Sequence, residues 1–269
     1  MARPVVALLT DFGTQDHYAG AMKGVILGIC PDVTLVDITH DIPAHDVTAG
    51  ALELAAAYKY FPAGTIFVAV VDPGVGSARR GFAADTGDYR FLAPDNGSLT
   101  AVLRDAPAKK MVELTERRYA RPTISRTFEG RDRFAPAAAW IAKGTPFSAL
   151  GRPISEIQRL DIPVPDAGAD AVRGVVLRVD RFGTLVTNID RKMVERLGQA
   201  GAITIDAAGQ RIERLVATYA ELPGDGVGAL FGSTDHLELA APSSSAADRL
   251  GLTRGAVVTV TRAAGSPIQ

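Results

Sequence analysis

The sequence predicts an α/β protein with two domains, an N-terminal mainly parallel α/β sandwich and a smaller C-terminal β-barrel. Three observations predict this architecture. In the first half, short apolar runs alternate with amphipathic stretches, which is typical of a parallel sheet covered by helices. In the last third, short strand-like runs follow one another with little helix between them. The length of 269 residues also accommodates two domains of typical size.

The elements of the first half follow from the apolar runs and their stop signals. Pro31 is expected to end one helix, and Asp46 to cap another that extends to about Tyr60. The run 65–71 is apolar and β-branched, as expected of a strand covered on both faces. We predict strands at 5–10, 33–38, 65–71, 81–85, 89–93 and 111–114, and helices at 19–29, 46–60, 99–104 and 135–143.

Residues 161–170 are rich in Pro, Asp and Gly and lack a helical period, so we predict a linker there. The linker divides the chain into domains 1–162 and 171–269. After it, turn residues separate seven short apolar runs, which favours a barrel. The predicted strands are 174–180, 185–189, 202–206, 211–216, 228–231, 237–240 and 256–262.

Composition excludes several classes of partner and site. There are 29 basic and 30 acidic side chains, so the basic excess that nucleic acid or an anionic membrane surface attracts is absent. No apolar stretch approaches the ~18 residues of a membrane span, and the apolar run before Asp11 is too short for a signal peptide. With Cys30 as the single cysteine, an internal disulfide is impossible. We expect a cytoplasmic protein without a metal site, since the four histidines lack metal-ligand spacing.

Carboxylates follow each of the first three predicted strands. Asp11 and Asp16 come after the first strand, Asp41 after the second and Asp72 after the third. Any one of them could simply begin a turn or cap a helix. Because ligands of open α/β sheets bind beyond the carboxyl ends of the strands, three such sites favour a cationic or polyhydroxylated ligand.

Motifs for nucleotide phosphates are missing from these positions. No Gly-x-Gly-x-x-Gly follows the first strand, and no Lys-Ser/Thr follows the glycines at 74 and 76. Those glycines could present backbone amides to an anion. However, Asp72 precedes them directly and would repel a phosphate. The sequence therefore favours a ligand without phosphate.

Seven segments together resemble one family, the S-adenosyl-L-methionine (SAM) hydroxide adenosyltransferases, or SAM hydrolases, which are related to the fluorinase and chlorinase. The most specific is Asp-Pro-Gly-Val-Gly followed by Ser-Ala-Arg-Arg. The segments lie in both predicted domains and extend over nearly the whole chain. They are 9–14, 18–24, 71–80, 93–97, 127–136, 180–188 and 232–240.

The resemblance implies attack of a water-derived hydroxide on C5′ of the SAM ribose, which releases adenosine and methionine without a cofactor. It implies a water-activating Asp-Arg-His set, whose Asp and Arg correspond to Asp72 and Arg79. The family's His is Glu129 here. Since a carboxylate is a weaker base than an imidazole, we expect a slower hydrolase or a shifted pH optimum, and we expect Glu129→His to raise turnover.

The resemblance also implies a set of substrate-binding positions. Asp11 would bind the ribose hydroxyls, Asp180 the methionine ammonium and Ser233 its carboxylate. Phe128, Phe182 and Tyr219 would line the apolar faces of SAM, although each could instead be an ordinary core residue. The further positions implied are Asp16, Thr184, Thr234 and Glu238.

Two segments depart from the family pattern. Thr184 stands where the family usually has an adenine-reading Asn, and Pro242 and Ser244 interrupt its Asn-x-Gly. These departures, with Glu129, leave a non-catalytic SAM- or adenosine-binding protein as the alternative. A halogenase is disfavoured because the anionic Asp72 would lie beside the halide. The resemblance implies a homotrimer with SAM bound between subunits.

Overall fold

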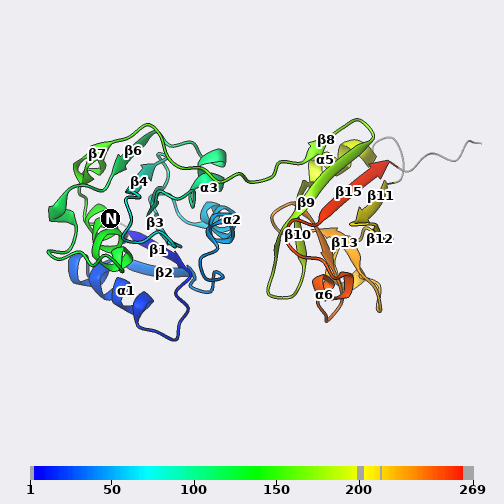
Figure 1. The fold of residues 1–269 in the computed structure, drawn as a ribbon, viewed down its shortest axis with the longest axis horizontal. Helices are drawn as coiled ribbons and strands as arrows, with labels where there is room; N and C mark the ends of the chain where they lie inside the picture. Colours follow the sequence, from blue (N-terminus) through cyan, green and yellow to red (C-terminus); the bar gives the residue numbers. More distant parts are fainter. Residues whose placement is uncertain (1–2, 199–202, 213, 263–269) are drawn as a thin grey trace, which may run out of the picture. The chain divides into compact units, whose positions relative to one another are not determined.

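The computed structural model describes residues 3–198, 203–212 and 214–262. The chain forms two compact units, Met1–Ile162 and Pro163–Gln269 (Figure 1). The division falls inside the Pro-rich stretch that the sequence marks as a linker. Part of that stretch is nevertheless regular structure, because Asp166–Ala167 forms a short strand that pairs with the next one. The linker prediction is wrong for those two residues.

The first unit contains one mixed sheet of seven strands. The strands are β1 (Val5–Thr10), β2 (Thr34–Thr39), β3 (Ile66–Val70), β4 (Gly81–Asp85), β5 (Arg90–Pro94), β6 (Lys110–Glu113) and β7 (Arg152–Pro153). Their order is β2-β1-β3-β5-β4-β6-β7. The pairs among β2, β1, β3 and β5 are parallel, whereas β4, β6 and β7 pair antiparallel. A four-residue connection joins β4 to β5, too short for a parallel crossover.

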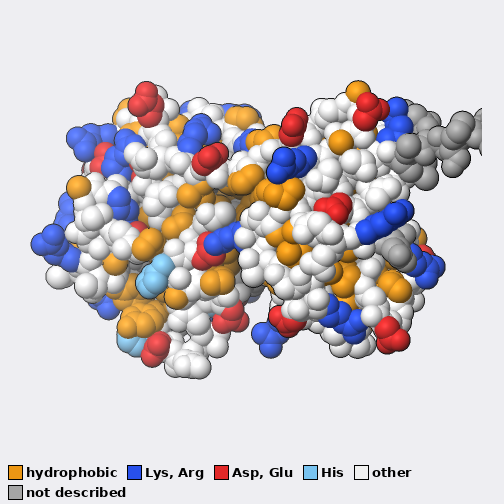
Figure 2. Space-filling model, turned by 45° about the vertical axis from the view of Figure 1, so that its right-hand side comes forward, with side chains coloured by type: hydrophobic (Ala, Val, Ile, Leu, Met, Phe, Trp, Pro, Cys, Tyr) orange, Lys and Arg blue, Asp and Glu red, His pale blue; other side chains and the backbone are white. Residues whose placement is uncertain are grey.

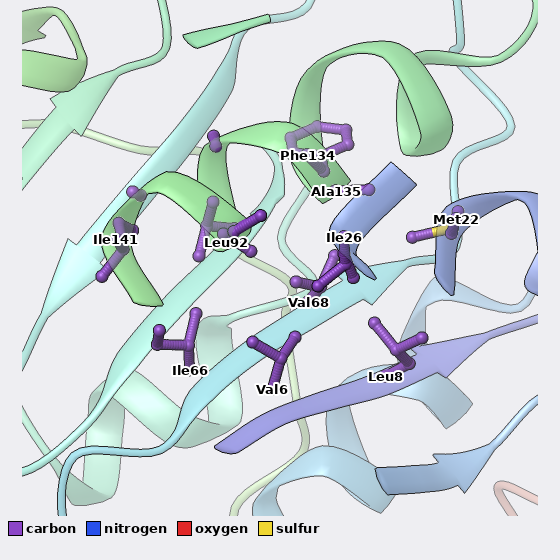
Figure 3. Close-up of a cluster of buried hydrophobic side chains, with 14 of the residues drawn as sticks. Val6, Leu8, Met22, Ile26, Ile66, Val68, Leu92, Phe134, Ala135 and Ile141 are labelled. Carbon is purple, nitrogen blue, oxygen red and sulfur yellow. The ribbon is translucent and has the colours of Figure 1, made fainter. Parts of the chain in front are cut away.

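Helices cover both faces of this sheet. They are α1 (Tyr18–Ile29), α2 (Val47–Ala57), α3 (Thr100–Asp105) and α4 (Ala135–Ala142). Alternate residues of β1 point to opposite faces. Val6 and Leu8 join the buried cluster with α1 and α4 (Figure 3), and Ala7 and Leu9 join the cluster with α2 and α3. The predicted α/β sandwich is confirmed, and Asp46 caps α2 by accepting a hydrogen bond from the Ala49 amide.

The second unit is an antiparallel, barrel-like sheet of eight strands. The strands are β8 (Asp166–Ala167), β9 (Ala171–Val179), β10 (Leu185–Asp190), β11 (Ile203–Ala207), β12 (Gln210–Ile212), β13 (Gly228–Phe231), β14 (His236–Ala240) and β15 (Val257–Arg262). The order β12-β11-β15-β9-β10-β14-β13 is an open path, with β8 beside β9. Most buried apolar side chains of these strands form one core, and Leu230 and Ala240 pack with Leu222 in a second, smaller cluster.

The second unit also differs from the prediction in detail. The expected strand 211–216 ends at Ile212, and Leu215 makes only an isolated bridge with Ala229. Residue 202, the expected start of another strand, lies outside the described residues. Two helices were not predicted, α5 (Arg191–Gly198) and α6 (Ala246–Leu250). The signal for α5 was the spacing of Val194 and Leu197, which are both buried in the core.

In the described ranges, no helix is long and apolar enough to cross a membrane. On the face shown in Figure 2, basic and acidic side chains are interspersed over the surface. This distribution agrees with the near balance of 29 basic and 30 acidic residues.

Candidate active site

A chain of polar contacts, buried at Thr10 and His40 and exposed at Asp37, fixes the loop that follows β1. Thr10 Oγ1 lies 2.8 Å from His40 Nδ1, and His40 Nε2 lies 3.0 Å from Asp37 Oδ1. Lys23 donates to the other oxygen of Asp37 at 2.6 Å. Burial raises the pKa of Asp37, but hydrogen bonds and charges from Lys23 and His40 outweigh it and lower the pKa. The Phe12 amide donates to Thr10 Oγ1 at 3.2 Å, so the chain holds the start of the loop.

The two carboxylates of this loop differ in their contacts. Asp11 Oδ2 accepts a hydrogen bond from the His45 amide at 2.9 Å, and His45 has a left-handed backbone with φ 68°. Asp11 therefore stabilises a strained turn with one oxygen. Asp16 is exposed in the same loop.

The turn that begins at Asp72, after β3, is closed by hydrogen bonds between its own backbone groups. The Val75 amide donates to the Asp72 carbonyl at 3.2 Å, and the Ser77 amide donates to the Gly74 carbonyl at 3.1 Å. Gly76 has φ +78°, and a Cβ there would collide with the backbone oxygen of Arg126. The amides of Val75 and Ser77 are therefore taken up within the turn itself.

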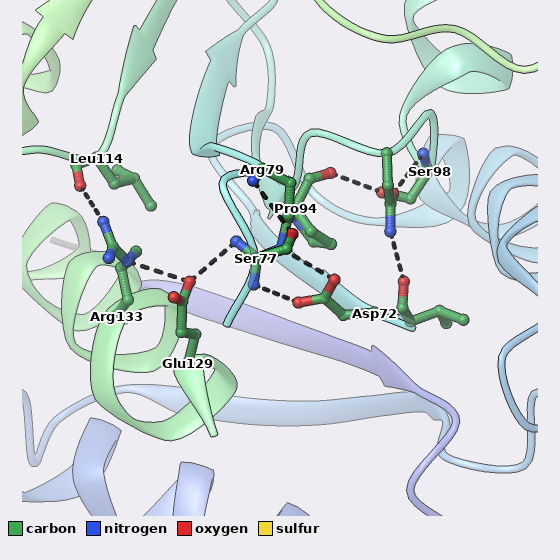
Figure 4. A network of polar contacts seen from close by, with 10 residues as sticks. Asp72, Ser77, Arg79, Pro94, Ser98, Leu114, Glu129 and Arg133 are labelled. Carbon is green, nitrogen blue, oxygen red and sulfur yellow. Dashed lines mark hydrogen bonds and ion pairs between the residues drawn. The ribbon is translucent and has the colours of Figure 1, made fainter. Parts of the chain in front are cut away.

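Arg79 joins two carboxylates from distant parts of the chain (Figure 4). Its Nε donates to Asp72 Oδ1 at 2.9 Å, its Nη2 donates to Asp72 Oδ2, and its Nη1 donates to Glu129 Oε2 at 2.9 Å. All three side chains are at most 11% exposed. Burial lowers the pKa of Arg79, but hydrogen bonds and charges from Asp72 and Glu129 outweigh it and raise the pKa. The guanidinium is therefore a permanent cation between two carboxylates.

A cavity of about 400 Å³ lies against this network. Asp72 and Glu129 supply carboxylates to its wall, and Phe128 supplies an aromatic ring. Phe128 packs edge-on against Phe12 and Tyr18, with centroid separations of 5.8 and 5.2 Å. The complete lining is Phe12, His17, Tyr18, Val70, Asp72, Val75, Ser125, Thr127, Phe128, Glu129, Gly130 and Arg131.

The segment that carries Phe128 and Glu129 is anchored by Asp132. The Asp132 side chain is fully buried; it accepts from Arg131 Nε at 2.7 Å and from the Ser125 amide at 2.8 Å, and Arg121 lies 3.5 Å away. Burial raises the pKa of Asp132, but Arg131, the Ser125 amide and Arg121 outweigh it and lower the pKa. The carboxylate thus ties the preceding loop to the turn that begins at Gly130.

A second cavity, of about 920 Å³, lies within the second unit. Asp180 Oδ1 accepts hydrogen bonds from the amides of Phe182 and Thr184, each at 2.9 Å. Phe182 is 80% exposed and Tyr219 is 53% exposed, so neither is a core residue, whereas Phe128 of the first unit is buried. The lining is Asp180, Phe182, Thr184, Tyr219, Ala220, Leu222 and 240–245.

Tyr219 is tied to the buried Glu238 through a hydrogen bond of 2.5 Å from its hydroxyl to Oε2. Burial and this acidic partner raise the pKa of Tyr219. Ser233 and Thr234 belong to the turn between β13 and β14, where Thr234 Oγ1 lies 3.2 Å from His236 Nδ1. Neither residue lines the cavity of the second unit.

Sequence reasoning missed several residues around these cavities. Arg133 contacts Glu129 at 3.3 Å, and its position four residues after Glu129 was the available signal. Phe12 and Tyr18 lie inside segments already singled out, but their packing on Phe128 required the fold. Across the described residues, no group of three or more His, Cys, Asp or Glu side chains could hold a metal ion.

Comparisons with known proteins agree with this two-domain architecture. Residues 6–151 match the SAM hydroxide adenosyltransferase N-terminal domain, and residues 174–259 match the corresponding C-terminal domain. The chain is 37% identical to "(R)-S-adenosyl-L-methionine hydrolase" of Salinispora tropica, an alignment of 96% of this chain and 98% of the relative. It is 38% identical to the protein of that name in Thermus thermophilus, over 94% and 97% of the two chains.

The chain is also similar to a protein named fluorinase and to solved structures. It is 30% identical to the fluorinase of an Actinoplanes species, over 97% of this chain and 98% of that one. A crystal structure of an uncharacterized conserved protein from Thermotoga maritima matches 96% of this chain and 100% of that one, with a TM-score of 0.90 and 30% identity. Because both family domains match and the alignments extend over nearly the whole chain, the chain belongs to the SAM hydroxide adenosyltransferase family.

Proposed function

We propose that this protein hydrolyses S-adenosyl-L-methionine to adenosine and L-methionine. The observation that carries the proposal is the buried Asp72–Arg79–Glu129 network on the wall of a cavity. The chain that builds it aligns over nearly its whole length with proteins named (R)-S-adenosyl-L-methionine hydrolase. We take their names as support for the (R) configuration at sulfur in the substrate.

The reaction suits a site of this charge. A water molecule gives a proton to a carboxylate of the network while its oxygen forms a bond to C5′ of the ribose. The C5′–S bond breaks, and its electron pair goes to the sulfonium sulfur. Because methionine then leaves as an uncharged thioether, the site needs no general acid. It must instead orient the water and exclude competing nucleophiles, and the reaction uses no cofactor.

The proposal divides the substrate contacts between the two units. In the first unit, Asp72, Arg79 and Glu129 organise the water, Asp11 and Asp16 bind the ribose, and Phe128 supplies an apolar wall. In the second unit, Asp180 binds the methionine ammonium, and Phe182 and Tyr219 contact the apolar faces. The remaining proposed contacts are Thr184, Ser233, Thr234 and Glu238.

The fluorinase relatives suggest halide transfer as a second candidate reaction, but the residues that line the first cavity disfavour it. Both Asp72 and Glu129 present carboxylates to that cavity. A halide ion must lose its water shell to react and needs hydrogen-bond donors in its place, whereas an ionised carboxylate can only accept hydrogen bonds. Water carries no charge and can donate to a carboxylate, so the same wall favours hydrolysis.

The proposal includes a homotrimer that works in the cytoplasm, with SAM bound between subunits. The 80% exposure of Phe182 and the 53% exposure of Tyr219 support it, because a ligand or a neighbouring chain would cover these rings. The free, buried Cys30 is compatible with a reducing compartment. Light scattering of the purified protein should give three times the mass of the chain; a monomer at assay concentration would contradict this part.

The function is tested by incubating the purified protein separately with (R)- and (S)-SAM in ¹⁸O-labelled water. We expect equal amounts of adenosine and methionine, with the label in the 5′-hydroxyl and the (R) epimer consumed faster. Parallel samples with chloride or fluoride should contain no 5′-halogenated nucleoside. If no adenosine forms above the uncatalysed level while calorimetry detects tight SAM binding, the protein is the non-catalytic binder instead.

A further inference from the structure

Glu129 contacts two guanidinium groups. Its Oε2 accepts a hydrogen bond from Arg79 Nη1 at 2.9 Å and lies 3.3 Å from Arg133 Nε. Figure 4 shows the carboxylate between the two arginines. Arg133 does not line the cavity that Asp72 and Glu129 line, so Arg133 would act on the site through Glu129.

The framework of the first unit holds the Arg133 side chain in place. Its Nη1 donates to the carbonyl of Leu114, the residue after β6, at 2.8 Å. The aliphatic part of the Arg133 side chain packs against Gly81 at the start of β4. A Cβ added to Gly81 would lie only 3.0 Å from Arg133 Cδ. The buried Nε has no hydrogen-bond partner within the described chain, so the Glu129 carboxylate beside it is its counter-charge.

The backbone between the two residues has an unusual form that suits this contact. Gly130–Phe134 makes a single π-helical turn, closed by a hydrogen bond from the Ala135 amide to the Gly130 carbonyl. Glu129 is the residue before this turn and Arg133 lies four residues later, the spacing at which helical side chains meet. Single π turns of this kind occur frequently at functional sites.

Arg133 completes the charge balance of the network. Asp72 and Glu129 bring two carboxylates, and Arg79 and Arg133 bring two guanidiniums. Without Arg133, two carboxylates that are at most 11% exposed would share the single cation Arg79. A buried cluster with unbalanced charge is costly, and Glu129 would lose one of the two guanidiniums that hold its carboxylate beside Arg79.

We propose that Arg133 is a positioning residue of the water-activating network, and that Glu129 and Arg133 act as one coupled pair that holds Arg79 in place. The proposal rests on the proposed hydrolase function. It also changes the expectation for Glu129→His. A neutral imidazole has one acceptor nitrogen but would face two guanidiniums, and a protonated one would be repelled by both. The histidine should therefore work only when Arg133 is removed as well.

The test is a double-mutant cycle on kcat and KM for adenosine formation, with wild type, R133M, E129H and E129H/R133M. We expect R133M and E129H each to lower kcat about tenfold or more, a loss typical of coupled residues, with KM changed less than about threefold. The double variant should exceed E129H in kcat by about fivefold or more. R133K keeps the charge but loses the planar fork that contacts both Leu114 and Glu129, so its kcat should lie between those of R133M and wild type.

Controls separate this proposal from a folding defect and from failure of the function. R104M removes an exposed arginine of α3 and should match wild type, and thermal unfolding of each variant reports its integrity. If R133M proves unstable, R133K and the comparison of E129H with E129H/R133M still decide the outcome. If the losses in kcat of R133M and E129H simply multiply in the double variant, the two residues are not coupled and the proposal is wrong. A kcat of R133M equal to that of wild type would also contradict it. A wild type that forms no adenosine would overturn the hydrolase function, and the coupled pair with it.

Discussion

The cavity of the first unit and the cavity of the second unit differ in how far their side chains are already paired. In the first, Arg79 uses Nε, Nη1 and Nη2 on Asp72 and Glu129, and the three side chains are buried. In the second, Asp180 and Tyr219 are also hydrogen-bonded, but the rings of Phe182 and Tyr219 are 80% and 53% exposed. The second cavity is also more than twice as large, at about 920 Å³ against about 400 Å³.

This difference indicates different tasks for the two cavities. Groups that are paired before the ligand arrives need no rearrangement during reaction, which is how enzymes stabilise a developing charge. Exposed aromatic rings gain contacts only when a ligand covers them. We therefore expect changes in the first cavity to act mainly on kcat and changes in the second to act mainly on KM.

The largest effect is expected for Asp72→Ala, which removes the double hydrogen bond to Arg79. Turnover should fall by at least ~100-fold, within the range for loss of a positioned acid–base group, while KM should change by less than about threefold. Initial rates of adenosine formation over a range of SAM concentrations measure both constants. Asp88→Ala, an exposed carboxylate between β4 and β5, is the control. A loss in kcat under about threefold would mean that Asp72 does not activate water.

The next effect concerns the stability of the first cavity's wall. Asp132→Ala removes a fully buried carboxylate and leaves Arg131 and the Ser125 amide without their acceptor. We expect the free energy of unfolding to fall by about 3 kcal/mol, as for other broken buried pairs. Urea denaturation measures it, with the exposed Asp32→Ala as control. A change under about 0.5 kcal/mol would show that the segment is held by other contacts.

The contribution of Asp132 should also depend on pH. Its pKa is lowered in the folded protein, below the value of about 3.9 expected in the unfolded chain. The stabilisation is therefore fully present above the unfolded pKa and is lost as pH falls through the folded pKa. The difference in stability between wild type and D132A should narrow below about pH 4. A constant difference down to pH 2 would contradict an ionic role for Asp132.

The sequence predicted the first unit more accurately than the second, for a physical reason. Buried strands such as β3 are apolar throughout, so their positions are evident from composition. In the second unit, α5 has a polar sequence with few apolar residues, and strand β12 ends after three residues. Short elements of this kind depend on tertiary contacts, which a local pattern does not contain.

The candidate site was predictable in part. The family resemblance selected Asp72, Arg79 and Glu129, and the structure joins them by hydrogen bonds. Arg133 could not be selected in that way, because its guanidinium is placed by the Leu114 carbonyl, nineteen residues earlier in the chain. Local sequence gives the four-residue spacing to Glu129, but only the fold provides the acceptor that fixes the orientation of Arg133.

A smaller effect is expected in the second cavity, and its form tests the comparison directly. Phe182→Ala should raise KM for SAM about tenfold, because a ligand loses the contact area of one aromatic ring, while kcat should stay within about twofold of wild type. The exposed Tyr60 of the first unit provides the control variant Tyr60→Ala. If kcat falls and KM does not change, Phe182 takes part in the chemical step and the division of tasks is wrong.

The smallest effect is expected for Tyr219→Phe, which removes the hydroxyl that donates to Glu238. A hydrogen bond to a charged acceptor is worth more than a neutral one, but Tyr219 is 53% exposed, so we expect a loss of only about 1 kcal/mol in urea denaturation. Because the folded pKa of Tyr219 is raised, this contribution is full below about pH 10 and declines as pH rises further. The difference in the free energy of unfolding between wild type and Y219F should therefore disappear at alkaline pH. Tyr60→Phe is the control variant. If Y219F leaves stability unchanged but raises KM about tenfold, the hydroxyl contacts the ligand rather than stabilising the fold.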